Sequence, residues 1–182
     1  MIFRATEIPG AGVVDLEKRA DERGFFGRSF CTDEFADHGI EMRVAQCNVS
    51  VSERRGTLRG LHYQAEPKPH SKLVRCTRGK IFDVAVDLRP DSPAYCRWIA
   101  VELDAATHRA LFVPAGCAHG FQTLTDDVEV LYLMGEAYDP ALDRGVRWND
   151  PAFGIAWPME PTAMSERDAG LADVRPEGGG SR

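Results

Sequence analysis

A run of short apolar segments separated by turns dominates residues 42–135 and constrains the fold more than any other feature. Each segment combines β-branched residues with alternating polar and apolar positions, a pattern typical of strands. The segments cover residues 42–52, 72–89, 96–103, 109–114 and 128–135. Arg78-Gly79 at the centre of the second segment predicts a hairpin. No long helical period interrupts the run, so the sequence predicts an all-β sandwich or barrel rather than an α/β fold.

Short helices and a tail complete the expected organisation. Helices are expected at residues 32–39, with Thr32 as a candidate N-cap, and near residues 104–108. The length of 182 residues predicts one domain, which we place at residues 1–171. Residues 172–182, "ADVRPEGGGSR", are poor in apolar side chains and are expected to form a flexible tail.

Charge and cysteine usage exclude several classes of function. The formal net charge is −6 and no basic run offsets it, which argues against nucleic-acid binding but permits a small anionic ligand. No segment has the roughly 20 apolar residues of a membrane span, and no signal peptide is recognisable, so a cytoplasmic protein without membrane contact is expected. The five cysteines are never spaced C-x-x-C, which predicts reduced thiols rather than disulfides or a zinc site.

One motif matches half of a metal-binding signature, but the other half is missing from the chain. "VPAGCAHGF" places Pro114, Gly116 and His119 at the P-x-G-x-x-H spacing of one half of the metal-binding cupin signature. The other half needs H-x-H, whereas this chain has His62-Tyr63-Gln64. His70 and Glu66 would make only a weak replacement site. The sequence therefore predicts that no metal is bound.

Acid–base chemistry is the other candidate, and it starts from His62 in "TLRGLHYQ". A histidine base needs an orienting carboxylate, and chemistry at carbon needs a cation for the developing negative charge. Lys72, Tyr132 and Asp168 are suitable residue types, as is His119. Each one alone also has a structural explanation, such as a snorkelling lysine, a core tyrosine or a surface carboxylate. These residues by themselves indicate no more than a β-barrel with a polar pocket.

Seven motifs follow one another along the chain: "RGFF" (23–26), "LRGLHYQ" (58–64), "KLVRC" (72–76), "FDVAVDLRPDSP" (82–93), "VPAGCAHGF" (113–121), "VLYL" (130–133) and "DRGVRWNDP" (143–151). In their order and intervals they resemble the dTDP-4-dehydrorhamnose 3,5-epimerase family of nucleotide-sugar epimerases. The resemblance runs from about residue 2 to residue 168. It implies a metal-free cupin jelly roll that needs no cofactor and forms a homodimer with N-terminal strands exchanged between subunits.

The resemblance also implies roles for individual residues. His62 matches the proton acceptor, Asp168 the carboxylate that orients it, Tyr132 the proton donor on the opposite face of the sugar, and Lys72 the lysine near the C4 carbonyl oxygen. The positions that match the family's substrate contacts are Arg23, Phe26, Arg28, Gln46, Asn48, Arg59, His119, Tyr138, Asp143 and Arg167. Among them, Tyr138 matches the tyrosine that stacks on the nucleobase.

Departures from the family pattern fall near the nucleotide end or the pocket wall, whereas the catalytic set is intact. Arg28 stands where glutamate is common, Cys47 and Val49 where polar residues are usual, and Leu133 where a lysine often follows the catalytic tyrosine. The expected reaction is epimerisation at C3 and C5 of a nucleotide-linked 4-keto-6-deoxyhexose, with dTDP-4-dehydro-6-deoxy-D-glucose as the first candidate. Alternatives are inversion at C3 or C5 alone, or a CDP- or other NDP-linked sugar. Further alternatives are a non-catalytic sugar-binding cupin and a metal-dependent cupin.

Overall fold

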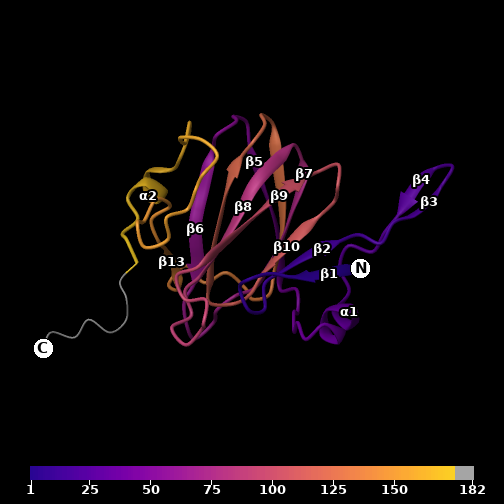
Figure 1. The fold of residues 1–182 in the computed structure, drawn as a ribbon, viewed down its shortest axis with the longest axis horizontal. Coiled ribbons are helices and arrows are strands. Elements are labelled where there is room, and N and C mark those ends of the chain that lie inside the picture. The colour runs from indigo at the N-terminus through magenta and orange to yellow at the C-terminus, as the bar shows by residue number, and fades with distance from the viewer. Residues whose placement is uncertain (175–182) are drawn as a thin grey trace, which may run out of the picture.

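The computed structural model describes residues 1–174, and within them two antiparallel sheets pack face to face (Figure 1). The first sheet has the order β1 (Ile2–Ala5), β2 (Gly12–Asp15), β10 (Ala110–Val113), β7 (Lys72–Arg78), β12 (Val128–Met134) and β5 (Gln46–Ser52). The second has the order β13 (Asp143–Gly145), β6 (Leu58–Gln64), β11 (Cys117–Thr123), β8 (Lys80–Asp87) and β9 (Trp98–Asp104). The predicted all-β sandwich is confirmed.

Apolar side chains from both sheets fill the space between them. Val74 and Leu111 come from the first sheet, and Ile81 and Phe121 come from the second. Along β12 the alternation of side chains turns Val130 towards this core together with Tyr132, which packs against it. The period-2 pattern of the strand therefore carries the tyrosine into the interior.

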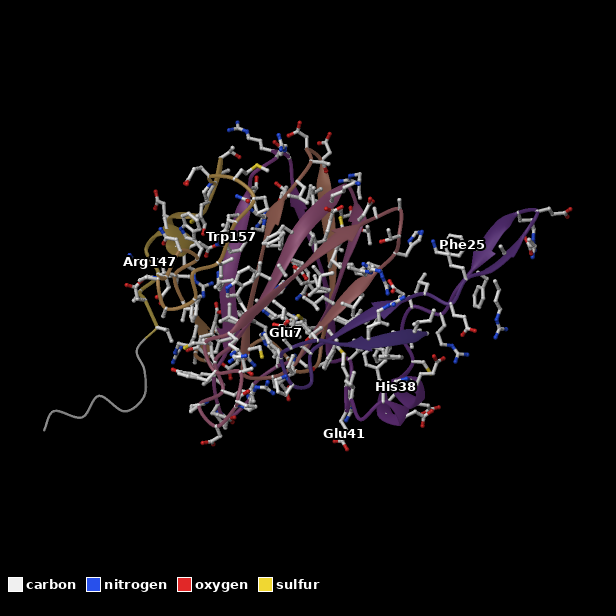
Figure 2. All side chains as sticks on the ribbon, viewed as in Figure 1. Glu7, Phe25, His38, Glu41, Arg147 and Trp157 are labelled. Carbon is white, nitrogen blue, oxygen red and sulfur yellow. The ribbon has the colours of Figure 1, made fainter. Side chains whose placement is uncertain are left out.

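The segment that follows β13 covers the outer face of the second sheet. Phe153 and Trp157 pack there against Val84 and Ala118, and Figure 2 shows Trp157 in this C-terminal segment. The short helix α2 (Glu166–Ala169) follows this segment and lies beside β6. This cover buries the second sheet on both faces, which explains why every residue of β11 is buried.

A hairpin near the N-terminus projects away from the sandwich. It consists of β3 (Arg19–Asp21) and β4 (Gly24–Phe26), and all of its strand residues are exposed. Figures 1 and 2 show this hairpin and Phe25 well outside the two sheets. We call residues 19–26 the arm. Helix α1 (Thr32–Asp37) follows it and packs Phe35 into a small cluster under the first sheet.

The prediction of a hairpin at Arg78-Gly79 is wrong, because the two strands that flank this turn do not pair with each other. The chain does reverse direction there. Gly79 has a φ of +77°, and a Cβ added at this position would lie 2.6 Å from Thr125 Oγ1. However, β7 pairs with β10 and β12, whereas β8 pairs with β9 and β11. The turn therefore joins opposing sheets, because both strands are central and each already has two neighbours.

The helix expected near residues 104–108 is also wrong, since residues 105–108 form a turn after β9. Asp104 accepts hydrogen bonds from Ala106 N and from the Thr107 hydroxyl, and such local bonds favour turns over helix. The helix expected at residues 32–39 is confirmed as α1, but Cys31 rather than Thr32 is its N-cap.

The predicted tail begins at residue 172, and its larger part lies outside the described residues. Its first residues are attached to the domain. Arg147 N donates to Ala172 O at 2.9 Å, and Val174 N donates to the Asp150 carboxylate.

Candidate active site

A pocket of about 570 Å³ lies between the two sheets, at the end where α2 approaches β6. Strands β5, β7 and β12 supply one wall, and strands β6 and β11 supply the other. Eight of the residues expected in the site line this pocket: Asn48, Arg59, His62, Lys72, His119, Tyr132, Arg167 and Asp168. The structure thus gathers side chains from distant parts of the sequence around one cavity.

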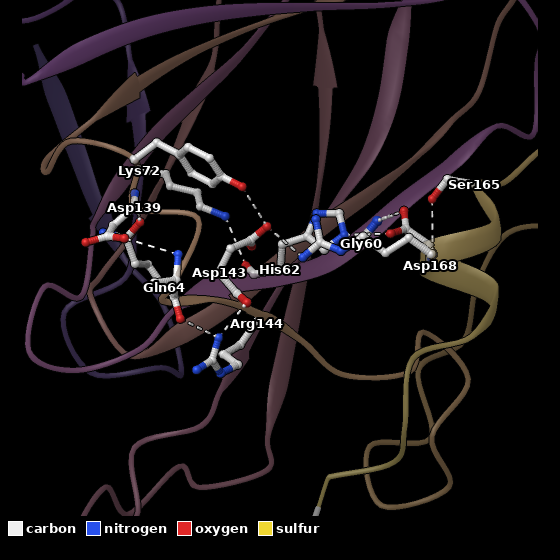
Figure 3. A network of polar contacts seen from close by, with 12 residues as sticks. Gly60, His62, Gln64, Lys72, Asp139, Asp143, Arg144, Ser165 and Asp168 are labelled. Carbon is white, nitrogen blue, oxygen red and sulfur yellow. Dashed lines mark hydrogen bonds and ion pairs between the residues drawn. The ribbon is translucent and has the colours of Figure 1, made fainter.

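His62 and Asp168 form a close pair on the β6 side of the pocket. Nε2 of His62 lies 2.7 Å from Oδ1 of Asp168, and Gly60 N donates to the other carboxylate oxygen at 3.1 Å (Figure 3). Burial opposes ionisation of Asp168, but its hydrogen bonds from His62 and Gly60 hold its pKa below the usual value. An ionised carboxylate only accepts, so the ring nitrogen that faces it carries the proton. In a neutral imidazole the other ring nitrogen then carries a lone pair, which is what a base requires.

Two local features place Asp168 beside His62. Ser165 caps α2, because its hydroxyl accepts a hydrogen bond from Asp168 N at 3.0 Å. Gly60 has a φ of +130°, and a Cβ at this position would lie 2.5 Å from the Cα of Gly120. Only glycine permits this close approach of β6 and β11 while its N–H points at the carboxylate.

Tyr132 reaches the pocket from the opposite sheet. Its hydroxyl lies 3.3 Å from the Ser50 hydroxyl, and its ring meets the His119 ring edge-on with centroids 6.1 Å apart. Burial raises the pKa of the Tyr132 phenol above its ordinary value. The phenol is therefore protonated at neutral pH and can donate a proton to a bound molecule.

Lys72 is a buried cation at the start of β7. Its Nζ donates to the backbone oxygen of His62 at 3.0 Å, and its residue is only 6% exposed. Burial lowers the pKa of Lys72 to about 8, although the nearby carboxylates of Asp83 and Asp143 oppose that shift. The amine is still charged at neutral pH, in surroundings where a charge interacts strongly with a ligand.

His119 belongs to a second histidine–carboxylate pair. It lies opposite His62 in the β6–β11 register, and its Nε2 is 2.7 Å from Oδ1 of Asp83. Burial lowers the pKa of His119, and the Asp83 carboxylate opposes this. With Nε2 engaged, His119 can offer a ligand its other ring nitrogen only.

Three further expected residues, Gln46, Tyr138 and Asp143, do not line the pocket, but polar contacts connect them to two residues that do, Asn48 and Arg167. The Tyr138 hydroxyl donates to Oδ2 of Asp143 at 3.1 Å, and Arg167 forms an ion pair with the same oxygen at 2.7 Å. Gln46 binds both Tyr138 N, at 2.7 Å, and the side chain of Asn48, at 3.2 Å. These residues form one connected polar group around an exposed aromatic ring.

The last three expected residues lie away from the pocket. Arg23 and Phe26 lie on the projecting arm, where Arg23 forms an ion pair with Asp21. Arg28 follows the arm and forms an ion pair with Glu34 of α1 at 2.7 Å.

The sequence reasoning missed several residues that support the site. Asp83 could have been recognised from the sequence, because it is an acidic residue in the middle of an apolar strand, "KIFDVAVD". Ser165 could have been recognised too, since S-x-x-D before a short helix is a capping pattern. Ser50 had no distinguishing feature, because a serine on an edge strand is ordinary.

No group of three or more His, Cys, Asp and Glu side chains within residues 1–174 is arranged to hold a metal ion. In the same range, neither helix has the length and apolar character needed to cross a membrane.

Comparison with known proteins gives a consistent result. Residues 5–175 match the family model described as dTDP-4-dehydrorhamnose 3,5-epimerase. The dTDP-4-dehydrorhamnose 3,5-epimerase of Methanothermobacter thermautotrophicus is 45% identical over 176 residues, which cover 95% of this chain and 94% of that protein.

Two solved structures show the same likeness. The dTDP-4-dehydrorhamnose 3,5-epimerase of Bacillus anthracis str. Ames, with TDP and PPi bound, has a TM-score of 0.91, 39% identity, and coverage of 95% of this chain and 99% of that chain. A 3'-monoepimerase from Streptomyces bikiniensis in complex with dTDP-quinovose has a TM-score of 0.83, 38% identity, and coverage of 92% and 85%. The sandwich is therefore the expected cupin jelly roll.

Proposed function

Because this chain belongs to the dTDP-4-dehydrorhamnose 3,5-epimerase family, we propose that it is an isomerase that inverts C3 and C5 of a dTDP-linked 4-keto-6-deoxyhexose. The substrate is dTDP-4-dehydro-6-deoxy-D-glucose, and the product is dTDP-4-dehydro-L-rhamnose. The observation that carries the proposal is the pocket's arrangement of a carboxylate-held base and a protonated phenol. His62 lies on a strand of one sheet, and Tyr132 lies on a strand of the other.

The reaction begins with removal of a proton from carbon. The C4 ketone acidifies the hydrogens at C3 and C5, so the free ring nitrogen of His62 can take one of them. Asp168 then stabilises the imidazolium that forms, because its carboxylate faces the proton-bearing nitrogen at 2.7 Å. The electron pair of the broken C–H bond moves into the ring and leaves an enolate with its charge on O4.

Lys72 stabilises that enolate. Its charged amine is buried in the pocket, so an oxyanion at O4 interacts with it much more strongly than in water. The amine is held by the backbone oxygen of His62, so it is oriented before the charge develops.

Inversion requires a new proton from the opposite face. Tyr132 donates this proton from the other sheet, and Ser50 holds the phenolic oxygen at 3.3 Å. Exchange with solvent then restores the phenol and removes the proton from His62. The same set of groups can act on the second carbon, because both carbons lie next to C4.

The nucleotide-diphosphate part of the substrate occupies the mouth of the pocket. Arg59 is suited to the diphosphate, because its planar guanidinium makes paired charge-assisted hydrogen bonds. Tyr138 is suited to the pyrimidine, because its exposed ring offers a flat stacking surface.

A second subunit completes the site in this proposal. The arm carries exposed Phe25 and Phe26, which are 43% and 73% exposed, and a short two-stranded ribbon is marginally stable alone. We infer a homodimer in which each arm crosses to its partner and places Arg23 and Phe26 at the nucleotide end of that pocket. We also place the enzyme in the cytoplasm, where the free thiols of its five cysteines would stay reduced.

A single-centre epimerase is the second candidate. The likeness to the Streptomyces bikiniensis 3'-monoepimerase shows that the same fold also accompanies inversion of one carbon. The decisive experiment is incubation of dTDP-4-dehydro-6-deoxy-D-glucose with the enzyme in deuterium oxide. We expect one deuteron at C3 and one at C5 of the product. Deuterium at one carbon only would support the second candidate, and no incorporation would contradict both.

A further inference from the structure

Gln64 is a buried polar residue for which the proposed reaction has no use. It ends β6, two residues after His62, and is 2% exposed. In the β6–β13 pairing it lies opposite Asp143. A buried side-chain amide needs partners for both its N–H groups and its oxygen, so its contacts indicate its role.

The three side-chain hydrogen bonds of Gln64 are to backbone atoms, and two of these atoms belong to the residues on either side of Tyr138. Nε2 donates to Ala137 O at 3.1 Å and to Lys68 O at 2.6 Å. Oε1 accepts from Asp139 N at 2.9 Å. One side-chain amide therefore holds the backbone carbonyl of Ala137 and the backbone N–H of Asp139, the residues on either side of Tyr138. Figure 3 shows Gln64 beside Asp139.

Packing cannot provide the same restraint, because Tyr138 is 54% exposed. The ring is otherwise held by its hydroxyl bond to Asp143 and by the bond from Tyr138 N to Gln46. A stacking surface that is already oriented before the base arrives binds more tightly, because no ordering cost is paid on binding. Gln64 supplies that orientation from a rigid strand.

We infer that Gln64 is a positioning residue that acts through Tyr138 and sets the affinity for the nucleotide. The inference rests on the proposed function, since it takes Tyr138 as the surface that stacks on the base. It leaves the chemistry untouched, because the contacts that hold Asp168 beside His62 come from Gly60 and Ser165.

The test combines a substitution with a double-mutant cycle. Gln64→Leu removes the donors and the acceptor at similar volume, and Gln64→Glu retains the acceptor for Asp139 N while losing the donors. Binding of dTDP is measured by calorimetry for wild type, each Gln64 variant, Tyr138→Ala, and Gln64→Leu combined with Tyr138→Ala. We expect Gln64→Leu to raise the Kd for dTDP about tenfold. We expect kcat to stay within about twofold of wild type at saturating substrate, and Tyr138→Ala to abolish any further effect of Gln64→Leu.

Gln122 provides a matched control. It is also fully buried, and its amide binds Met159 O at 2.9 Å and Met159 N at 3.2 Å, far along the chain from Tyr138. Gln122→Leu should lower thermal stability as Gln64→Leu does, but leave the Kd for dTDP unchanged. Equal weakening of dTDP binding by Gln122→Leu would show that Gln64 acts only through general stability and would overturn the inference.

Other outcomes separate this inference from the proposed function. If Tyr138→Ala weakens dTDP binding but neither Gln64 variant does, the positioning role is wrong and the proposed function stands. An undiminished effect of Gln64→Leu in the Tyr138→Ala background would also overturn the role. If Tyr138→Ala itself leaves dTDP binding unchanged, the proposed nucleotide site is wrong and the inference falls with it. Should Gln64→Leu not fold, Gln64→Glu decides by the same criteria.

Discussion

Nε2 of His62 lies 2.7 Å from Oδ1 of Asp168, although 106 residues separate the two along the chain. Asp168 is delivered by the segment that first covers the outer face of the second sheet and then returns to β6 as α2. His62 and Asp168 are thus brought together only by the complete fold. Any variant that loosens this segment should weaken catalysis before it unfolds the sandwich.

The first prediction concerns the base. His62→Asn should abolish hydrogen exchange at both carbons while the protein stays folded, because the His62 side chain is 31% exposed and supports little packing. We expect kcat to fall by roughly 10²–10⁴-fold. Deuterium wash-in followed by NMR is the measurement, and circular dichroism checks the fold. Near wild-type wash-in would show that His62 only binds substrate.

The carboxylate gives a control for this prediction. Asp168→Asn should also lower kcat, and the double variant with His62→Asn should be no worse than His62→Asn alone, because the two groups act as one unit. Independent, multiplicative losses would contradict their coupling.

The second prediction separates the two faces of the sugar. Tyr132→Phe removes one hydroxyl, so proton abstraction by His62 should continue while inversion is lost. We expect slow deuterium wash-in with little epimer formed. Ser50→Ala, which removes only the partner of the phenol at 3.3 Å, should have a much smaller effect. An equal loss of wash-in and inversion in Tyr132→Phe would make Tyr132 a residue that positions the substrate.

The strands and the fold class were largely predictable, because β12 alternates between more and less buried side chains over its first residues and β10 is a short apolar run that is buried throughout. Strands β6 and β11 escaped prediction because Gly60 and Gly120, with polar residues next to them, interrupt the apolar pattern. The turn at Gly79 was found, but its connection of opposing sheets depends on long-range pairing that no local pattern contains.

The site was predictable only in part. Its residue roles came from a family resemblance, since His62, Tyr132 and Asp168 each have an ordinary structural explanation when taken alone. Asp83 could have been suspected from its place in an apolar strand, but its partner His119 is 36 residues away. Arg23, Phe26 and Arg28 lie on or next to the arm, outside the pocket of their own chain, and the proposed crossing of the arm to a partner cannot be predicted from a local sequence pattern.

The third prediction is a pH profile. Burial lowers the pKa of Lys72 to about 8. Below this pH the amine is charged and stabilises the enolate, and above it the amine is neutral, so kcat/KM should fall as the pH rises through about 8. Burial raises the pKa of Tyr132, so ionisation of Tyr132 does not cause this fall in kcat/KM. In Lys72→Arg the fall should be absent, because a guanidinium keeps its charge. A wild-type profile that stays flat to pH 10 would show that Lys72 is not the required cation.

The fourth prediction tests the crossing arms by complementation. A chain with His62→Asn and a chain with Arg23→Ala and Phe26→Ala should each be nearly inactive alone. In a mixed dimer, the intact arm of the first chain reaches the intact His62 of the second, which restores one site. Random mixing should then recover roughly a quarter of wild-type activity. As a control, a chain that carries all three substitutions is mixed with each of these two chains in turn, and neither mixture should regain activity. Recovery in that control, or none in the experiment, would contradict the crossing.

The last prediction concerns the base that the nucleotide carries. Thymine and uracil present an N3–H donor, whereas cytosine presents an N3 acceptor, so a free arginine at the base would favour cytosine. Arg28 is not free, because Nη1 donates to Oε1 of Glu34 at 2.7 Å. We therefore expect wild type to bind dTDP and UDP more tightly than CDP, and Arg28→Glu to leave that order unchanged in calorimetric titrations. Glu34→Gln weakens the ion pair and should raise the affinity for CDP selectively. If Arg28→Glu changes the order while Glu34→Gln does not, Arg28 reads the base in spite of its partner, and the ligand is no longer expected to be dTDP-linked.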